Sequence, residues 1–207
     1  MELLLEALEW IGTIAFSISG AITGLKNKMD LFGVAALGVI TATGGGILRD
    51  IMMGKIPPRV FENPYVLLAA LVAALAIFFG ARSNRIPNLK LEKTVLFAAD
   101  TLGLSAFTVI GIQYGIQANI QSFSLLLTLG VLTAVGGGIV RDVCAGNVPD
   151  IFLKHIYALA SVAGAAAYIL TYRFWSTAAA TVTALIFIIL IRILAMVFRW
   201  DLPKSRL

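Results

Sequence analysis

The stretch TATGGGILRD, residues 41–50, decides the fold, because it returns almost unchanged as TAVGGGIVRD at residues 133–142. In each copy three consecutive glycines interrupt a long apolar run, and an Arg-Asp pair follows after two more apolar residues. Each glycine in a helix interior costs about 1 kcal/mol relative to alanine, so a triplet weakens a helix considerably. The repeated pattern predicts two helices that are broken at matching points.

The rest of the chain is strongly apolar. Charged residues make up 13% of the sequence, about half the share that a soluble domain carries. Several apolar runs reach the roughly 20 residues that a helix needs to cross a bilayer. These runs lack the alternation of barrel strands, and lipid offers the backbone no hydrogen-bond partners. We therefore predict an all-α integral membrane protein.

Seven transmembrane spans follow from the apolar runs, and the glycine triplets fall in the second and the fifth. The spans are expected at about Leu3–Leu25, Leu31–Met53, Tyr65–Ala81, Thr94–Tyr114, Phe123–Ala145, Ile151–Tyr172 and Ser176–Phe198.

The internal similarity extends beyond the glycine motif. Matching pairs are Glu9 with Asp100, Phe16 with Phe107, Gly54 with Gly146, Pro57 with Pro149 and Tyr65 with Tyr157. We expect a single membrane domain over residues 1–207, with a first repeat at about 3–82, a second at about 93–172 and an extra seventh helix at about 176–198. Three spans per repeat make the second repeat enter from the opposite side, so the repeats are expected to be inverted.

Basic residues gather on one side of this topology, which sets the orientation by the positive-inside rule. That side holds Lys26, Lys28, Arg82, Arg85, Lys90, Lys93, Lys154, Arg199, Lys204 and Arg206. The other side holds the acidic N-terminus with Lys55, Arg59 and Arg173. We expect the N-terminus outside and the C-terminus in the cytoplasm.

The glycine triplets have two interpretations. Inverted repeats with discontinuous helices typically place a transport path between the repeats, where exposed carbonyls replace water around a cation. The path would then be lined by Gly44, Gly45, Gly46, Gly136, Gly137, Gly138, Thr41 and Thr133. The alternative is close helix packing through small residues.

The charged residues inside the spans are candidates for a functional site, because lipid makes ionisable groups costly. Arg49 and Arg141 would approach from opposite membrane halves, and each pairs either with its neighbour, Asp50 or Asp142, or with the aspartate of the other repeat. These pairs are expected to act as a gate or as a scaffold. Glu9 and Asp100 lie near span starts, where we expect them to reach the membrane surface.

An enzyme is not expected, because the chain has one cysteine and one histidine and shows no nucleophile–base pair or metal-ligand spacing. We expect no cofactor beyond a transiently bound potassium or sodium ion. The net charge of +5 is explained by membrane topology, so no nucleic-acid partner is expected.

The segments GGGILRD (44–50) and GGGIVRD (136–142) resemble the signature of prokaryotic trimeric intracellular cation (TRIC) channels, a family also described as an uncharacterised or "glycine transporter" membrane domain. The resemblance covers about residues 5–172, and the seventh span fits it too. It implies a homotrimer among the lipids of the inner (plasma) membrane. Each protomer would carry its own pore for monovalent cations, potassium and also sodium, lined by the kinked second and fifth helices. A secondary transporter of a small solute such as glycine is the alternative function.

Overall fold

The structure is a computed structural model, and it describes residues 2–83, 89–153 and 156–200. Four of the basic residues used to predict the orientation, Arg85, Lys154, Lys204 and Arg206, lie outside these ranges.

The described residues form helices joined by short loops, and none of them forms a strand, which confirms the predicted all-α class. The helices are α1 (Glu2–Lys26), α2 (Leu31–Met52), the short 3-10 helix η1 (Arg59–Phe61), α3 (Pro64–Arg82), α4 (Leu89–Gln117), α5 (Phe123–Cys144), α6 (Asp150–Leu153), α7 (Ile156–Phe174) and α8 (Thr177–Val197).

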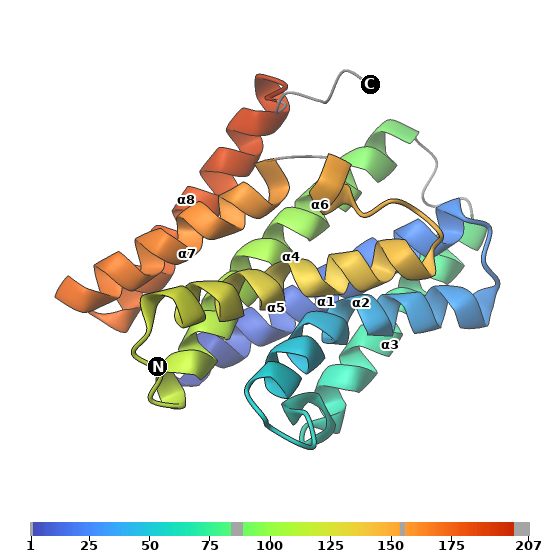
Figure 1. The fold of residues 1–207 in the computed structure, drawn as a ribbon. Helices are drawn as coiled ribbons and strands as arrows, with labels where there is room; N and C mark the ends of the chain where they lie inside the picture. The colour runs from blue at the N-terminus through green and yellow to red at the C-terminus, as the bar shows by residue number, and fades with distance from the viewer. Residues whose placement is uncertain (1, 84–88, 154–155, 201–207) are drawn as a thin grey trace.

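Four helices form the centre of the molecule. α1 packs against α2 and α4, and α5 packs against the same two helices. α3 covers one side of this group by contacting α1 and α2, while α7 and α8 cover the other side (Figure 1). The two glycine triplets therefore meet in the middle, on the contact between α2 and α5.

The outer surface is apolar, as a lipid-facing surface has to be. Large apolar side chains are exposed on α3 and α8, among them Leu68, Val72, Ile186 and Leu190. Six helices, α1 to α5 and α8, are long and apolar enough to cross a membrane. The chain is a multi-pass membrane protein. α7 has 19 residues, and its membrane crossing stays a prediction.

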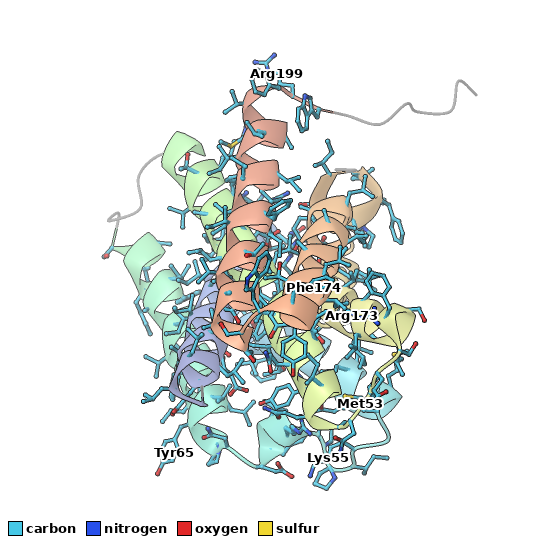
Figure 2. All side chains as sticks on the ribbon, turned by 90° about the vertical axis from the view of Figure 1, so that its left-hand side faces the viewer. Met53, Lys55, Tyr65, Arg173, Phe174 and Arg199 are labelled. Atoms are coloured by element: carbon cyan, nitrogen blue, oxygen red, sulfur yellow. The ribbon has the colours of Figure 1, made fainter. Side chains whose placement is uncertain are left out.

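The helices run between two ends of the molecule. Met53, Lys55 and Tyr65 lie at one end, and Arg199 lies at the other (Figure 2). We name these ends after the motif arginines: α2 finishes at the Arg49 end, whereas α5 and α8 finish at the Arg141 end.

The observed helices depart from the prediction in three places. α2 and α5 are each one helix across their glycines, so the predicted breaks are not confirmed. The sixth predicted span, 151–172, is divided between α6 and α7. The fourth helix begins at Leu89 rather than Thr94, because residues 89–93 form a charged first turn that a search for apolar runs leaves out.

Candidate functional site

The middle glycine of each triplet lies where α2 and α5 touch. A β-carbon at Gly45 would overlap the carbonyl oxygen of Thr133, and one at Gly137 would overlap the carbonyl oxygen of Thr41. Only glycine lets the two backbones approach this closely. The packing interpretation of the triplets therefore holds for these two positions.

The third glycine of each triplet has a different environment. A β-carbon at Gly46 would lie 3.7 Å from Nη2 of Arg49, which is an ordinary contact. At Gly138 the nearest atoms would be the hydroxyl oxygen of Tyr157 at 3.5 Å and Nη2 of Arg141 at 3.9 Å. These two glycines face the arginine of their own motif rather than the opposite helix.

The remaining predicted path residues are buried in the helix contacts. A β-carbon added at Gly44 would lie 3.6 Å from Cα of Gly137. One added at Gly136 would lie 3.1 Å from Cα of Gly45. The hydroxyls of two threonines turn back into their own helices: Thr41 donates to the carbonyl of Leu37 and Thr133 to that of Leu129, each at 2.6 Å.

Each motif aspartate joins its arginine to the loop that follows. Oδ1 of Asp50 accepts from Nε of Arg49 at 2.9 Å, while Oδ2 accepts from the backbone N–H of Arg59 at 2.8 Å. Asp142 repeats this arrangement, with Arg141 at 2.7 Å and the backbone N–H of Asp150 at 2.9 Å. Each arginine thus pairs with its sequence neighbour, so of the two predicted pairings the local one is found.

The Arg141 end contains a closed network of charges. Nη1 of Arg141 lies 2.7 Å from Oδ1 of Asp100 and 2.5 Å from the hydroxyl of Ser19, which itself donates to Asp100 at 2.7 Å. Asp100 is 4% exposed. The prediction that Asp100 reaches the membrane surface is therefore wrong, because Arg141 and Ser19 compensate its burial inside the protein.

A further charged residue at this end, Arg192, was not among the predicted site residues. Arg192, on α8, is 8% exposed, and its Nε donates to the hydroxyl of Thr101 at 3.3 Å. Its guanidinium lies over the rings of Phe97, at 4.7 Å, and Tyr157, at 4.8 Å. A lone arginine within an apolar run of twenty residues is the sequence signal that would have identified it.

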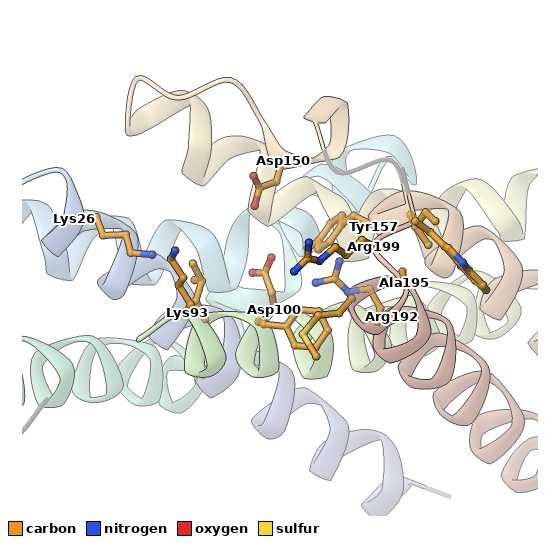
Figure 3. Close-up of a pocket in the computed structure, with 13 residues that line it drawn as sticks. Lys26, Lys93, Asp100, Asp150, Tyr157, Arg192, Ala195 and Arg199 are labelled. Carbon is orange, nitrogen blue, oxygen red and sulfur yellow. The ribbon is translucent and has the colours of Figure 1, made fainter. Parts of the chain in front are cut away.

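A cavity of about 520 Å³ opens at the Arg141 end and reaches this network. Asp100 and Asp150 project into it between two lysines, Lys26 and Lys93, and two arginines, Arg192 and Arg199 (Figure 3). Tyr157 also lines the cavity and contacts the Gly138 position. The cavity therefore leads toward the second glycine triplet.

The Arg49 end has a smaller cavity of about 250 Å³, which Glu6, Glu9, Gln113 and Tyr114 line among others. The ring of Tyr114 contacts two guanidinium groups, with centroid distances of 4.2 Å to Arg49 and 4.1 Å to Arg59. Because Arg49 adjoins Gly46, this cavity leads toward the first triplet.

The arrangement places a cavity with charged side chains in its lining at each end of an apolar helix bundle. Each cavity is lined by a tyrosine near a motif arginine, Tyr157 near Arg141 and Tyr114 near Arg49, and the described linings contain no glycine of the triplets. Among the described residues, no cluster of histidine, cysteine, aspartate and glutamate has the size of a metal site.

Comparison with known families and sequences gives a consistent result. A family model described as "Glycine transporter" matches residues 6–82 and 97–173. The inner membrane protein YadS (UPF0126) of Escherichia coli K12 is 34% identical over 195 residues, which are 94% of this chain and 92% of the relative. A UPF0126 membrane protein of Deinococcus radiodurans is 39% identical over 170 residues, 79% of this chain and 76% of its own.

Solved structures of similar sequence share the whole fold. A prokaryotic TRIC channel crystallised in 0.5 M KCl superposes with a TM-score of 0.89 at 30% identity, covering 98% of this chain and 100% of its own. A TRIC orthologue from Rhodobacter sphaeroides gives 0.86 at 31% identity, over 95% and 99%. A TRIC cation channel from a study of conductance gives 0.85 at 34% identity, over 98% and 97%.

Proposed function

The chain belongs to the prokaryotic TRIC channel family, and from this membership we propose that it is a passive channel for monovalent cations, potassium and also sodium. The membership also agrees with the prediction that it is not an enzyme. The channel works without a resident cofactor, so the permeating ion is its only small-molecule ligand.

One observation carries this proposal: two cavities with charged side chains lie at opposite ends of an apolar bundle, and each is lined by a tyrosine that lies beside a motif arginine. A path for ions needs polar access from both membrane faces and a short barrier between them. Gly46 and Gly138 are assigned to the border of the path because they adjoin Arg49 and, at the other end, Tyr157 and Arg141. Gly44, Gly45, Gly136 and Gly137 are assigned to the barrier. Conduction then requires α2 and α5 to move apart at these glycines.

The Arg-Asp pairs act as a scaffold in this scheme. Asp50 and Asp142 neutralise the adjacent arginines and hold the following loop through its backbone. A neutralised arginine beside the path repels a cation much less than a bare one. We assign a gating role as well to the Arg141–Asp142 pair, because Arg141 also binds Asp100 on α4 and Ser19 on α1.

The larger arrangement follows the inverted-repeat design. Residues 3–82 and 93–172 form two repeats of opposite orientation, and the helix at 176–198 is added to the second. The protein is a homotrimer of seven-span protomers in the inner membrane, each with its own path. The N-terminus lies outside, so the Arg141 end faces the cytoplasm and the Arg49 end faces outward.

A secondary transporter of glycine is the competing function, since the matching family model carries that description. The solved relatives, which are cation channels by name, do not favour it. Reconstitution of the purified protein into planar bilayers separates the two functions. We expect resolved unitary currents in potassium chloride. Saturable glycine uptake into proteoliposomes without unitary currents would instead establish the transporter.

A further inference from the structure

Arg192 is the one charged residue of α8 between Thr177 and Val197, and it points into the protein. Its contacts are the Thr101 hydroxyl and the faces of two aromatic rings. No ion pair joins it to a carboxylate in the part of the chain that the structure describes. It therefore brings a positive charge to the cavity that no direct contact with an acid cancels.

Asp100, a carboxylate that lines the same cavity as Arg192, is already paired with Arg141. Asp100 accepts from Arg141 and from Ser19, and Arg141 is shared with Asp142. Two carboxylates and one arginine leave this network with one negative charge, which Arg192 balances at a longer distance. Without Arg192 the floor of the cavity would be negative and would attract cations.

The two cavities also differ in the charges around them. The larger cavity is lined by four basic residues and two acidic ones, whereas the described lining of the smaller cavity has Glu6 and Glu9 and no lysine or arginine. Lys93 and Arg199 are exposed, so ions in solution screen them. Arg192 is buried and held by its contacts, so its charge is fixed where ions would pass.

We propose that Arg192 is a specificity-determining residue that discriminates against divalent cations at the Arg141 end of the path. The proposal rests on the channel function proposed above. Coulomb repulsion doubles when the valence doubles. In water, a fixed positive charge about 6 Å away lowers the occupancy of a monovalent cation by about threefold. The same charge lowers the occupancy of a divalent cation by about tenfold. Arginine suits this task because it stays charged at every relevant pH.

The test compares calcium and potassium permeability in planar bilayers that contain the full-length protein. Reversal potentials are measured with potassium on one side and calcium on the side of the Arg141 end. Removal of the charge in Arg192→Gln is expected to raise the calcium-to-potassium permeability ratio by about threefold at low salt. The increase shrinks at high salt, because screening shortens the reach of the charge.

Two variants serve as controls. Arg192→Lys keeps a positive charge at the same place and is expected to keep the wild-type ratio. Arg173→Gln removes an exposed arginine from the last turn of α7, at the opposite end, and is expected to change nothing. A structural defect would alter conductance at all salt concentrations alike, so the salt dependence separates charge from folding.

A second pair of variants covers the case in which Arg192→Gln fails to fold. Ala195 lines the same cavity three residues after Arg192, on the same face of α8. Ala195→Glu neutralises Arg192 in place and should raise the ratio, while Ala195→Gln, of the same shape, should not.

The outcomes keep the two proposals apart. A wild-type protein without unitary currents overturns the channel function and the role of Arg192 together. If the wild type conducts but both Arg192→Gln and Ala195→Glu leave the permeability ratio unchanged, only the role of Arg192 is overturned.

Discussion

The Arg49 end and the Arg141 end carry the same ten-residue motif in different surroundings. In both, the aspartate holds the arginine and caps the next loop. Arg141 has a second carboxylate, Asp100, and the Ser19 hydroxyl, whereas Arg49 lies against the face of Tyr114. The motif therefore supplies a common scaffold, and the helices around it decide how tightly each arginine is held.

A second arginine lies at each end, Arg59 at the Arg49 end and Arg192 at the Arg141 end. Arg59 comes from η1 and Arg192 comes from α8, so the two positions do not correspond in the repeat. Both nevertheless place a guanidinium against a tyrosine ring, the half-buried Tyr114 or the buried Tyr157. Similar chemistry has been built twice from unrelated positions, and the ends differ mainly in how many carboxylates balance it.

The largest effect is expected where the two halves are alike, at the glycine contact. In both Gly45→Ala and Gly137→Ala the new methyl group meets a backbone carbonyl of the opposite helix, so the backbones have to separate. We expect each variant to lose about 3 kcal/mol, the upper end of the usual cost of overpacking, or to misfold. Thermal unfolding in detergent and the yield of monodisperse protein measure this.

Gly46→Ala and Gly138→Ala are the matched controls, because their added methyl groups make ordinary contacts at 3.7 Å and 3.5 Å. Both should fold normally. Equal stability of the four variants would contradict the division of each triplet into a glycine that packs on the opposite helix and a glycine that faces its motif arginine.

The next effect separates the two ends. Asp100→Asn removes one of the two buried carboxylates of Arg141 and leaves the charge of Arg192 unbalanced, which should cost about 3 kcal/mol. Glu9→Gln changes the matching position at the other end, where the half-buried Glu9 makes no ion pair with a described residue. Its cost should stay below about 1 kcal/mol. Similar losses in chemical denaturation would show that both ends hold their acids equally.

These differences explain which features the sequence could predict. Apolar length was enough to place six membrane-spanning helices, and the repeated motif was enough to identify Arg49, Asp50, Arg141 and Asp142 as a set. The environment of Asp100 depends on Arg141, which lies 41 residues away, so a rule based on its distance from a span end placed it wrongly at the surface.

The sequence could not predict which glycine of a triplet contacts the opposite helix either. Gly45 and Gly46 are adjacent and identical, yet one touches the opposite helix and the other touches Arg49. Their difference is set by the crossing of α2 and α5, which no local pattern encodes. Arg192, by contrast, was visible in the sequence as a charge inside an apolar run, and only its partners required the fold.

A smaller effect is expected from the aromatic contact that distinguishes the Arg49 end. Tyr114→Leu removes the ring that two guanidinium groups face, at 4.2 Å and 4.1 Å from its centroid. Each such contact contributes about 0.5–1 kcal/mol, so the loss should be about 1–2 kcal/mol in thermal unfolding. Tyr114→Phe keeps the ring and should lose little. Equal losses in both variants would assign the stabilisation to the hydroxyl and not to the ring.

The smallest effect concerns Ser19, which belongs to the Arg141 end alone because Ile110 occupies the matching position in the second repeat. Ser19→Ala removes a hydroxyl that accepts from Arg141 and donates to Asp100, and should cost about 1 kcal/mol. Ser105→Ala is the control, because its hydroxyl only returns to its own helix at Leu102. A double-mutant cycle with Asp100→Asn should show non-additive losses, since both residues hold the same guanidinium. Strict additivity in that cycle would mean that Ser19 stabilises its own helix and does not help to fasten Arg141.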